Sequence, residues 1–163
     1  MNEEEHMPIF GIGPFLVFPI LLLSFISLIM SIYKKIPVYQ IHELNFPFLI
    51  IGIILILAGI IIWLFAVVIS KITQKIIDNK LVKTGIYSYI RHPIYSAFLF
   101  ISTGLIILSQ NIFLFFLPIL YWIILTIGMK KTEEKWLLEK FGDKYLEYSK
   151  EVNRFIPFFN FYK

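Results

Sequence analysis

The strongest constraint on this chain is a long stretch, residues 93–129, that contains no Asp, Glu, Lys, Arg or His. A helix needs about 20 residues to cross a hydrocarbon core roughly 30 Å thick, so this stretch is too long for a single membrane span. Three consecutive polar residues, Ser-Gln-Asn at 109–111, interrupt it. The pattern predicts a tight hairpin of two membrane helices, over 93–108 and 112–129.

Two further apolar runs, at 15–32 and 46–70, precede the hairpin, and neither contains a charged residue. Each is long enough to cross a bilayer. Hydrophobic residues make up 58% of the 163 residues, which is more apolar surface than a core of this size can bury. We therefore expect an all-α integral membrane protein with four transmembrane helices. The helix at 93–108 rises only about 24 Å, so it is short for a full crossing.

Basic residues are concentrated on one side of this topology. Four crossings place the N-terminus, the segment 71–92 and the C-terminal tail on the same face of the membrane. The basic residues of that segment and of the start of the tail are Lys71, Lys75, Lys80, Lys83, Arg91, Lys130, Lys131 and Lys135. Because cytoplasmic loops are enriched in Lys and Arg, we expect this face, and with it the C-terminus, to be cytoplasmic. The net charge of +4 is then a topology signal, and no nucleic-acid partner is expected.

The tail itself, residues 132–151, is charged and amphipathic. Its apolar residues recur at three- and four-residue spacings, as one face of a helix requires. They are Trp136, Leu137, Leu138, Phe141, Tyr145 and Tyr148. Gly142 interrupts the pattern, and Asp143 is a suitable N-cap for a second helical piece. At the other end of the chain, residues 1–7 are acidic and lack the basic region of a signal peptide, so we expect the first apolar run to be retained.

Several kinds of chemistry are disfavoured by the composition. The chain has no cysteine, which excludes disulfides, thiolate metal ligands and a cysteine nucleophile. No histidine or carboxylate spacing typical of a metal site occurs, and we expect no metal. Glycine-rich phosphate loops and the nucleophile elbow of serine hydrolases are also missing from the sequence.

Two polar clusters flank the hairpin and are therefore expected to be neighbours in space. The first contains Arg91 and His92 just before Pro93, which suits the first turn of a helix. The positive end of the helix dipole, a guanidinium and an imidazole together favour an anion. The nearby tyrosines are Tyr87, Tyr89 and Tyr95. The alternative is that these residues are interfacial anchors and part of an aromatic belt.

The second cluster contains the adjacent acids Glu133 and Glu134, which follow the second arm of the hairpin. Two carboxylates at this position are suited to neutralise an ammonium or a sulfonium group on a ligand. The alternative is a solvated helix face with incidental Lys–Glu pairs. The residues alone leave both interpretations open.

Three segments resemble a known family. They are Asn79-Lys-Leu-Val-Lys-Thr-Gly-Ile-Tyr-Ser-Tyr-Ile-Arg-His-Pro-Ile-Tyr95, Thr132-Glu-Glu-Lys-Trp-Leu-Leu-Glu-Lys-Phe-Gly-Asp-Lys-Tyr-Leu-Glu-Tyr148 and Arg154-Phe-Ile-Pro157. Together with the hairpin between them, they are similar to the isoprenylcysteine carboxyl methyltransferases and to their relatives, the membrane phospholipid methyltransferases. The resemblance covers roughly residues 75–158. The two N-terminal helices match only in being hydrophobic.

The resemblance implies an enzyme that uses S-adenosyl-L-methionine, with a role for each matching residue. The cofactor-binding residues are expected to be Asn79, Lys80, Leu81, Val82, Tyr87, His92, Pro93, Tyr95 and Glu133. Catalytic roles are expected for His92, Arg91 and Glu134, and substrate binding for Lys130 and Arg154. One domain over 1–163 is expected, with two N-terminal helices in 1–70 and the cofactor-binding catalytic core in 71–163.

The chain departs from the family at three positions, one of which is Ala97, where many relatives have Gly. Asn79 stands where the isoprenylcysteine enzymes often have His, and Met129 stands where they have an arginine that contacts the substrate. Lys130 and Lys131 are candidate substitutes for that arginine.

The expected function is methyl transfer to a hydrophobic or membrane-embedded substrate, a lipid or a lipidated small molecule, as in the isoprenylcysteine enzymes. The first alternative is N-methylation of a phospholipid amine, and the second is a non-catalytic membrane scaffold with the same fold. A carboxylate or thiolate substrate needs no general base, whereas an amine must first lose a proton, for which His92 is the available base.

Overall fold

The computed structural model describes residues 12–70 and 80–157. Four apolar helices form the body: α1 Gly13–Ile32, α2 Asn45–Leu64, α4 Pro93–Leu108 and α5 Leu117–Lys131. The π-helical turn η2 Phe65–Ile69 extends α2, and three short 3-10 turns, η1 His42–Leu44, η3 Gly85–Ser88 and η4 Ile112–Leu114, lie between the helices. Two charged helices, α6 Glu133–Phe141 and α7 Asp143–Glu151, follow α5. No β-strand occurs within these two described ranges.

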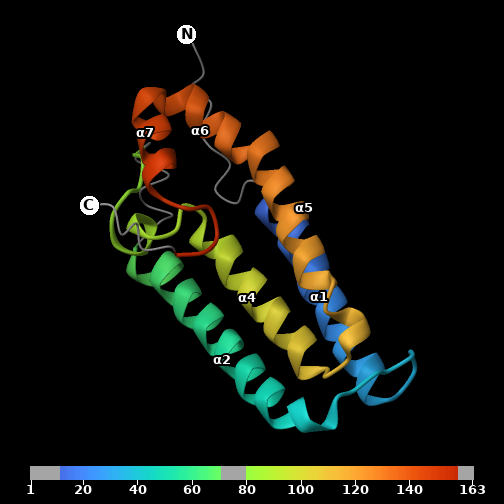
Figure 1. Cartoon of the computed structure of the whole chain (residues 1–163). Coiled ribbons are helices and arrows are strands. Elements are labelled where there is room, and N and C mark those ends of the chain that lie inside the picture. The colour runs from blue at the N-terminus through green and yellow to red at the C-terminus, as the bar shows by residue number, and fades with distance from the viewer. Residues whose placement is uncertain (1–11, 71–79, 158–163) are drawn as a thin grey trace.

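Helix α4 is the centre of the bundle, because it contacts α1, α2 and α5 (Figure 1). It packs on α2 through small residues. A Cβ atom added to Gly59 would lie 2.6 Å from the carbonyl oxygen of Ala97, and one added to Gly104 would lie 2.7 Å from that of Gly52. The two helix backbones therefore approach more closely than larger side chains would permit, as is common between membrane helices.

The predicted helical segments are confirmed. The first arm of the hairpin has the predicted bounds, 93–108, whereas the second begins with a 3-10 turn before α5 starts at Leu117. Three helical segments, 13–32, 42–69 and 112–141, each contain an apolar stretch long enough to cross a membrane, the last of them continuing into the charged α6, and α4 is a shorter apolar helix. The protein is thus an all-helical integral membrane protein with three long apolar helices.

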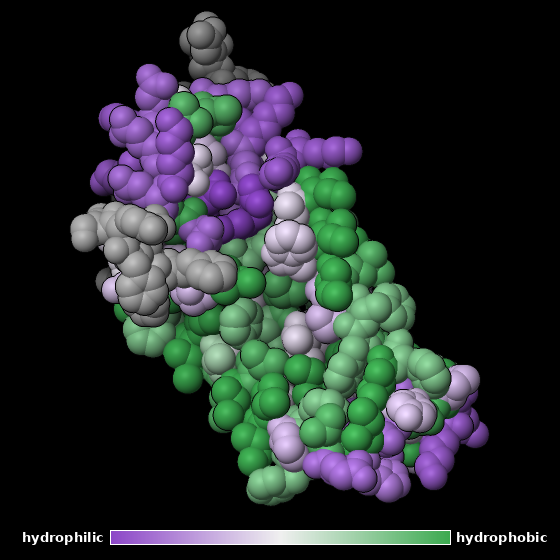
Figure 2. Space-filling model, viewed as in Figure 1, coloured by the Kyte–Doolittle hydropathy of each residue, from purple (hydrophilic) through white to green (hydrophobic). Residues whose placement is uncertain are grey.

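The outward faces of these helices are apolar, and Figure 2 shows a broad hydrophobic surface between two polar ends. Phe18 on α1, Ile54 on α2 and Ile123 on α5 are among the large exposed side chains. In water such a surface would be unfavourable, and facing lipid it is the expected arrangement. The interior between α1, α4 and α5 is filled by Ile20, Leu99 and their neighbours.

The hairpin tip is held at the end of the bundle remote from α6 and α7. Asn111 is fully buried, and both the oxygen and the nitrogen of its side-chain amide form hydrogen bonds. Its Oδ1 accepts from the backbone N–H groups of Tyr39 at 3.2 Å and Phe113 at 3.3 Å. Its Nδ2 donates to the carbonyl of Pro37 at 3.0 Å and to the hydroxyl of Ser31 at 3.3 Å. The predicted polar interruption is therefore a tight turn tied to the loop that follows α1.

The tail forms two helices, as predicted, but the expected N-cap was wrong. Gly142 is the N-cap of α7, with φ +52°, and Asp143 is the first residue of the helix without a side-chain capping hydrogen bond. The positive φ at this position separates α6 from α7, and glycine adopts it at the lowest cost.

Candidate active site at the polar end of the bundle

The two polar clusters predicted to be neighbours are in contact. The loop before α4, the first turn of α6, and α7 lie at the same end of the molecule (Figure 1). His92 is the N-cap of α4, and Pro93 takes the first helical position, where its missing N–H leaves no hydrogen bond unmade. Across from this helix end stand Glu133 and Glu134, which open α6.

Glu134 is the centre of the charged cluster. Its carboxylate accepts two hydrogen bonds from Arg154, from Nε at 2.6 Å and from Nη2 at 2.8 Å. Its Oε1 also lies 3.2 Å from Nε2 of His92 and 3.4 Å from Nη1 of Arg91. Burial on its own would raise the pKa of Glu134, but the hydrogen bonds from His92 and Arg154 and the charge of Arg91 hold this pKa well below its usual range. The anion at the start of α4 is therefore a carboxylate of the protein itself.

Glu133 has a different environment. It accepts a hydrogen bond from the hydroxyl of Tyr95, and its Oε2 lies 3.7 Å from Nδ1 of His92. No arginine or lysine of the described residues pairs with it, and 26% of its side chain is exposed. Burial raises the pKa of Glu133, and the neighbouring Glu134 raises it further, while His92 and Tyr95 partly offset this effect. Glu133 is thus an incompletely neutralised carboxylate at the edge of the cluster.

Helix α7 supplies two tyrosines that cover the cluster. The hydroxyl of Tyr148 donates to the carbonyl of Tyr87 at 2.5 Å, and Nη1 of Arg91 donates to the hydroxyl of Tyr145 at 3.3 Å. Burial and the charge of Glu134 raise the pKa of Tyr145 to about 12, so this phenol stays protonated near neutral pH. The sequence placed Tyr145 and Tyr148 on an apolar helix face and missed their place beside Arg91, although their three-residue spacing put them on one side.

The C-terminal segment 152–157 closes the other side of the cluster. The N–H of Arg91 donates to the carbonyl of Asn153 at 2.8 Å, and the N–H of His92 to that of Arg154 at 3.1 Å. The hydroxyl of Ser96 donates to the carbonyl of Phe155. Sequence reasoning gave Ser96 and Phe155 no role, because a single backbone pairing carries no pattern in the sequence.

The remaining predicted residues lie at different places. Val82 is buried and Leu81 is half-buried just before η3, whereas Lys80 is exposed and Asn79 lies outside the described residues. Lys130 is exposed at the end of α5. The residue before it, Met129, is fully buried in the hydrophobic core. Roles for all these positions stay predictions.

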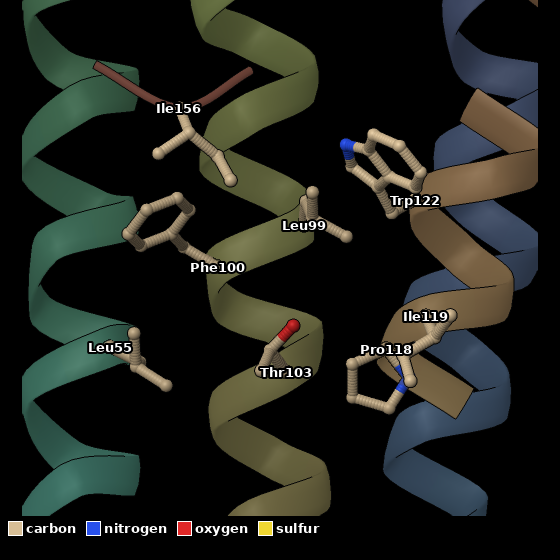
Figure 3. A pocket seen from close by; sticks show the side chains of 8 residues that line it. All are labelled: Leu55, Leu99, Phe100, Thr103, Pro118, Ile119, Trp122 and Ile156. Atoms are coloured by element: carbon tan, nitrogen blue, oxygen red, sulfur yellow. The ribbon is translucent and has the colours of Figure 1, made fainter. Parts of the chain in front are cut away.

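An apolar groove of about 330 Å³ lies between the helices of the bundle and the C-terminal segment. Figure 3 shows its lining side chains on α2, α4 and α5 and on the C-terminal segment. Leu99 lies one helical turn below Tyr95, and Ile156 follows directly on the buried Phe155. Trp122, which is 46% exposed, forms the α5 side of the opening. The groove is therefore an apolar hollow in the membrane-exposed part of the bundle.

Within residues 12–70 and 80–157, no group of three or more His, Asp or Glu side chains is arranged to hold a metal ion. The geometry instead offers a carboxylate with spare capacity, a histidine between two carboxylates, and tyrosines around them. These features define a class of protein: a helical membrane protein with a charged, partly enclosed site where its apolar helices end.

The chain belongs to the phospholipid methyltransferase family, which matches residues 47–144, more than half of the chain. It is 40% identical over 88 residues, 53% of its length, to protein-S-isoprenylcysteine O-methyltransferase of Saccharomyces cerevisiae. It is 37% identical over 83 residues, 49% of its length, to the protein of that name in Schizosaccharomyces pombe. It is 35% identical over 83 residues, 50% of its length, to protein-S-isoprenylcysteine O-methyltransferase B of Arabidopsis thaliana.

The matched regions cover 36%, 34% and 42% of these three relatives, so the match spans well under half of their length. No solved structure matches the chain. The resemblance seen in the sequence is confirmed at the level of the family.

Proposed function

We propose that this protein is an S-adenosyl-L-methionine-dependent methyltransferase that acts on a hydrophobic or membrane-embedded substrate. The observation that carries the proposal is the environment of Glu133, a largely buried carboxylate without an arginine or lysine partner in the described part of the chain. It stands beside His92 and Tyr95 in a chain that belongs to a methyltransferase family. A carboxylate left in this state favours a cationic ligand.

The residues of the cluster fit the proposed cofactor. Glu133 suits its ammonium or sulfonium group. Tyr87 and Tyr95, which flank His92 in the sequence, offer it flat aromatic surfaces. Leu81 and Val82 are the apolar residues proposed to complete this pocket. When bound, S-adenosyl-L-methionine supplies a methyl group already activated by a positively charged sulfur.

The protein's own part in the reaction is orientation and exclusion of water. His92 is held at the N-cap of α4 and Glu134 at the start of α6, so both are fixed by backbone elements. The phenols of α7 cover the cluster from the water side. A rigid site of this kind lowers the barrier by holding the reacting groups in line, which is worth several kcal/mol.

The groove is the proposed position of the apolar part of the substrate. Its walls are hydrophobic and come from α2, α4, α5 and Ile156 of the C-terminal segment. A lipid chain that entered from the bilayer would bury its apolar surface there while its polar group reached the cluster. Lys130, which is exposed at the end of α5, stays a candidate for contact with a polar head group.

The proposed topology has four transmembrane helices, α1, α2, α4 and α5, with the cluster and α6–α7 on the cytoplasmic side. The exposed Lys83, Lys130 and Lys131 on that side support this orientation through the positive-inside rule. We also propose that residues 1–163 act as one domain, in which the first two helices support a catalytic core formed by residues 71–163. The contact of α2 along α4 supports this arrangement.

A second candidate function is N-methylation of a phospholipid amine. The observation that favours it is that Arg91 and Arg154 are both engaged by Glu134 and that Met129 is buried in the core. In the described residues no arginine is left for a carboxylate substrate, whereas Glu133 would attract an amine. The third alternative, a non-catalytic scaffold, requires that the protein bind no cofactor.

The decisive experiment is calorimetric titration of the detergent-purified full chain with S-adenosylhomocysteine. We expect micromolar binding to the wild type and at least a tenfold loss in Glu133→Gln. The matched control is Glu139→Gln, which removes an exposed carboxylate from the same helix and is expected to bind as wild type does. A folded wild type that binds nothing would favour the scaffold. Head-group analysis of membranes from expressing cells then separates the two substrates, because N-methylated lipids would support the second candidate.

A further inference from the structure

The C-terminal segment lies beyond the residues matched by the family, yet it forms one wall of the charged cluster. Its backbone is paired to the loop before α4 through the carbonyls of Asn153 and Arg154. Phe155 is 1% exposed and anchors the segment in the hydrophobic core. The segment is therefore held in place by backbone hydrogen bonds and apolar packing, whatever the charge of its side chains.

The guanidinium group of Arg154 forms a bidentate ion pair with the carboxylate of Glu134. The distances are 2.6 Å from Nε to Oε1 and 2.8 Å from Nη2 to Oε2. Two parallel hydrogen bonds fix the plane of the carboxylate as well as its position, which a single bond does not do. Arg91 approaches the same carboxylate at 3.4 Å through one nitrogen and does not fix its plane in this way.

The orientation of Glu134 determines the surroundings of His92. Oε1 of Glu134 lies 3.2 Å from Nε2, and because a carboxylate only accepts hydrogen bonds, this nitrogen carries a proton. On the other edge of the ring, Nδ1 lies 3.7 Å from Oε2 of Glu133, which is too long for a direct hydrogen bond. The two ring nitrogens are therefore distinct: Nε2 is hydrogen-bonded to Glu134, whereas Nδ1 faces Glu133 without a direct hydrogen bond.

We propose that Arg154 is a positioning residue, which holds Glu134 against Nε2 of His92, keeps that nitrogen protonated and turns Nδ1 towards Glu133. Without the bidentate ion pair, Glu134 keeps Arg91 as a partner but is free to rotate about its terminal torsion. The ring of His92 then loses the acceptor that selects its protonation pattern. A lysine at position 154 would preserve the charge but supply a point contact in place of two parallel bonds.

The consequence for chemistry rests on the proposed function. If the methyl acceptor is a protonated amine, Nδ1 is the nitrogen that can take its proton when His92 is in its neutral form, since Nε2 then carries the ring proton. This assignment replaces the substrate-binding role expected of Arg154 from the sequence. When a methyl acceptor is identified, we expect Arg154→Gln to lower kcat roughly tenfold or more and to leave cofactor affinity unchanged.

The test is nitrogen NMR of the full chain labelled with ¹⁵N-histidine in detergent micelles, at a pH of about 8, above the ordinary histidine pKa. In the wild type, Nε2 of His92 is expected to show the chemical shift of a protonated nitrogen. In Arg154→Gln and in Glu134→Gln it should move towards the value averaged between tautomers. Lys150→Gln removes an exposed positive charge from the same tail and should leave the signal unchanged, and His42 is an internal reference at the other end of the bundle.

If Arg154→Gln fails to fold because it has lost a positive charge, Arg154→Lys restores that charge and is used in its place. Its Nε2 chemical shift is expected to lie between those of the wild type and of the tautomer average. A wild-type Nε2 signal in a folded Arg154→Gln, or in Arg154→Lys where the glutamine variant unfolds, overturns the positioning role. Titration of the same samples with S-adenosylhomocysteine keeps the two proposals apart. An altered Nε2 signal in a protein that binds no cofactor supports the positioning role while it removes the methyltransferase proposal.

Discussion

Both ends of this helical bundle bury polar side chains, but the two groups differ in kind. At the hairpin tip, the neutral amide of Asn111 makes four hydrogen bonds and joins two loops. At the opposite end, the charged Glu134 has several partners, whereas the described residues offer the adjacent Glu133 only a phenol and a distant imidazole nitrogen. Neutral groups with their hydrogen bonds made are what a fold needs, and incompletely neutralised charges are typical of functional sites.

The most severe way to break this contrast is to remove Glu134. Glu134→Ala leaves the half-buried Arg91 and Arg154 without their counter-charge, and we expect a loss of about 3 kcal/mol in the free energy of unfolding. Thermal unfolding of the purified protein in detergent measures the effect. Glu139→Ala, on the exposed face of the same helix, should change stability by less than about 0.5 kcal/mol. Equal effects of the two substitutions would mean that the cluster is not coupled as the distances indicate.

Replacing Asn111 tests the other end. Asn111→Leu leaves the backbone N–H groups of Tyr39 and Phe113 without their acceptor, and we expect a loss of about 2–3 kcal/mol. Affinity for S-adenosylhomocysteine should not change, because the site is at the far end of α4. Lys35→Gln, in the exposed loop after α1, is the control for stability. A loss of binding in a folded Asn111→Leu protein would show that the two ends are not independent.

The two glutamates are also expected to differ in how their contributions to stability depend on pH. The pKa of Glu133 is raised above its ordinary value of 4.5, so the folded state binds this proton more tightly than the unfolded state. Its contribution to stability is therefore full below pH 4.5 and is lost as the pH rises through the folded pKa. For Glu134 the pKa is lowered, so its contribution is present above pH 4.5 and is lost as the pH falls towards the folded pKa.

Unfolding curves measured from pH 3 to 8 for Glu133→Gln and Glu134→Gln would separate these contributions. We expect each to amount to about 1 kcal/mol or more per unit of pKa shift. Glu133→Gln should remove the loss of stability above pH 4.5, and Glu134→Gln the loss below it. Cofactor affinity in the wild type should fall as Glu133 becomes protonated, because the cation then loses its partner. An affinity that stays constant over this range would argue against Glu133 as the cation site.

Much of the bundle could be predicted because lipid-facing helices leave a strong pattern. The charge-free run 93–129 and its polar interruption at 109–111 gave both arms of the hairpin and the turn between them. The hairpin in turn predicted that the residues around His92 and Glu133 would meet. The capping residue of α7 was predicted to be Asp143 instead of Gly142, because a glycine with positive φ and an aspartate cap both suit a Gly-Asp pair.

The chain's sequence by itself determined the membrane class, the helical segments, the family and the pairing of the two polar clusters, since hydropathy and motif spacing are local properties. Only the tertiary structure decided how the charges are distributed within the cluster. That Glu134 takes both Arg91 and Arg154 while Glu133 takes neither depends on the path of the C-terminal segment, far away in the sequence. The physical reason is that the pairing of buried charges is set by distances of a few ångströms between elements, which no spacing along the chain records.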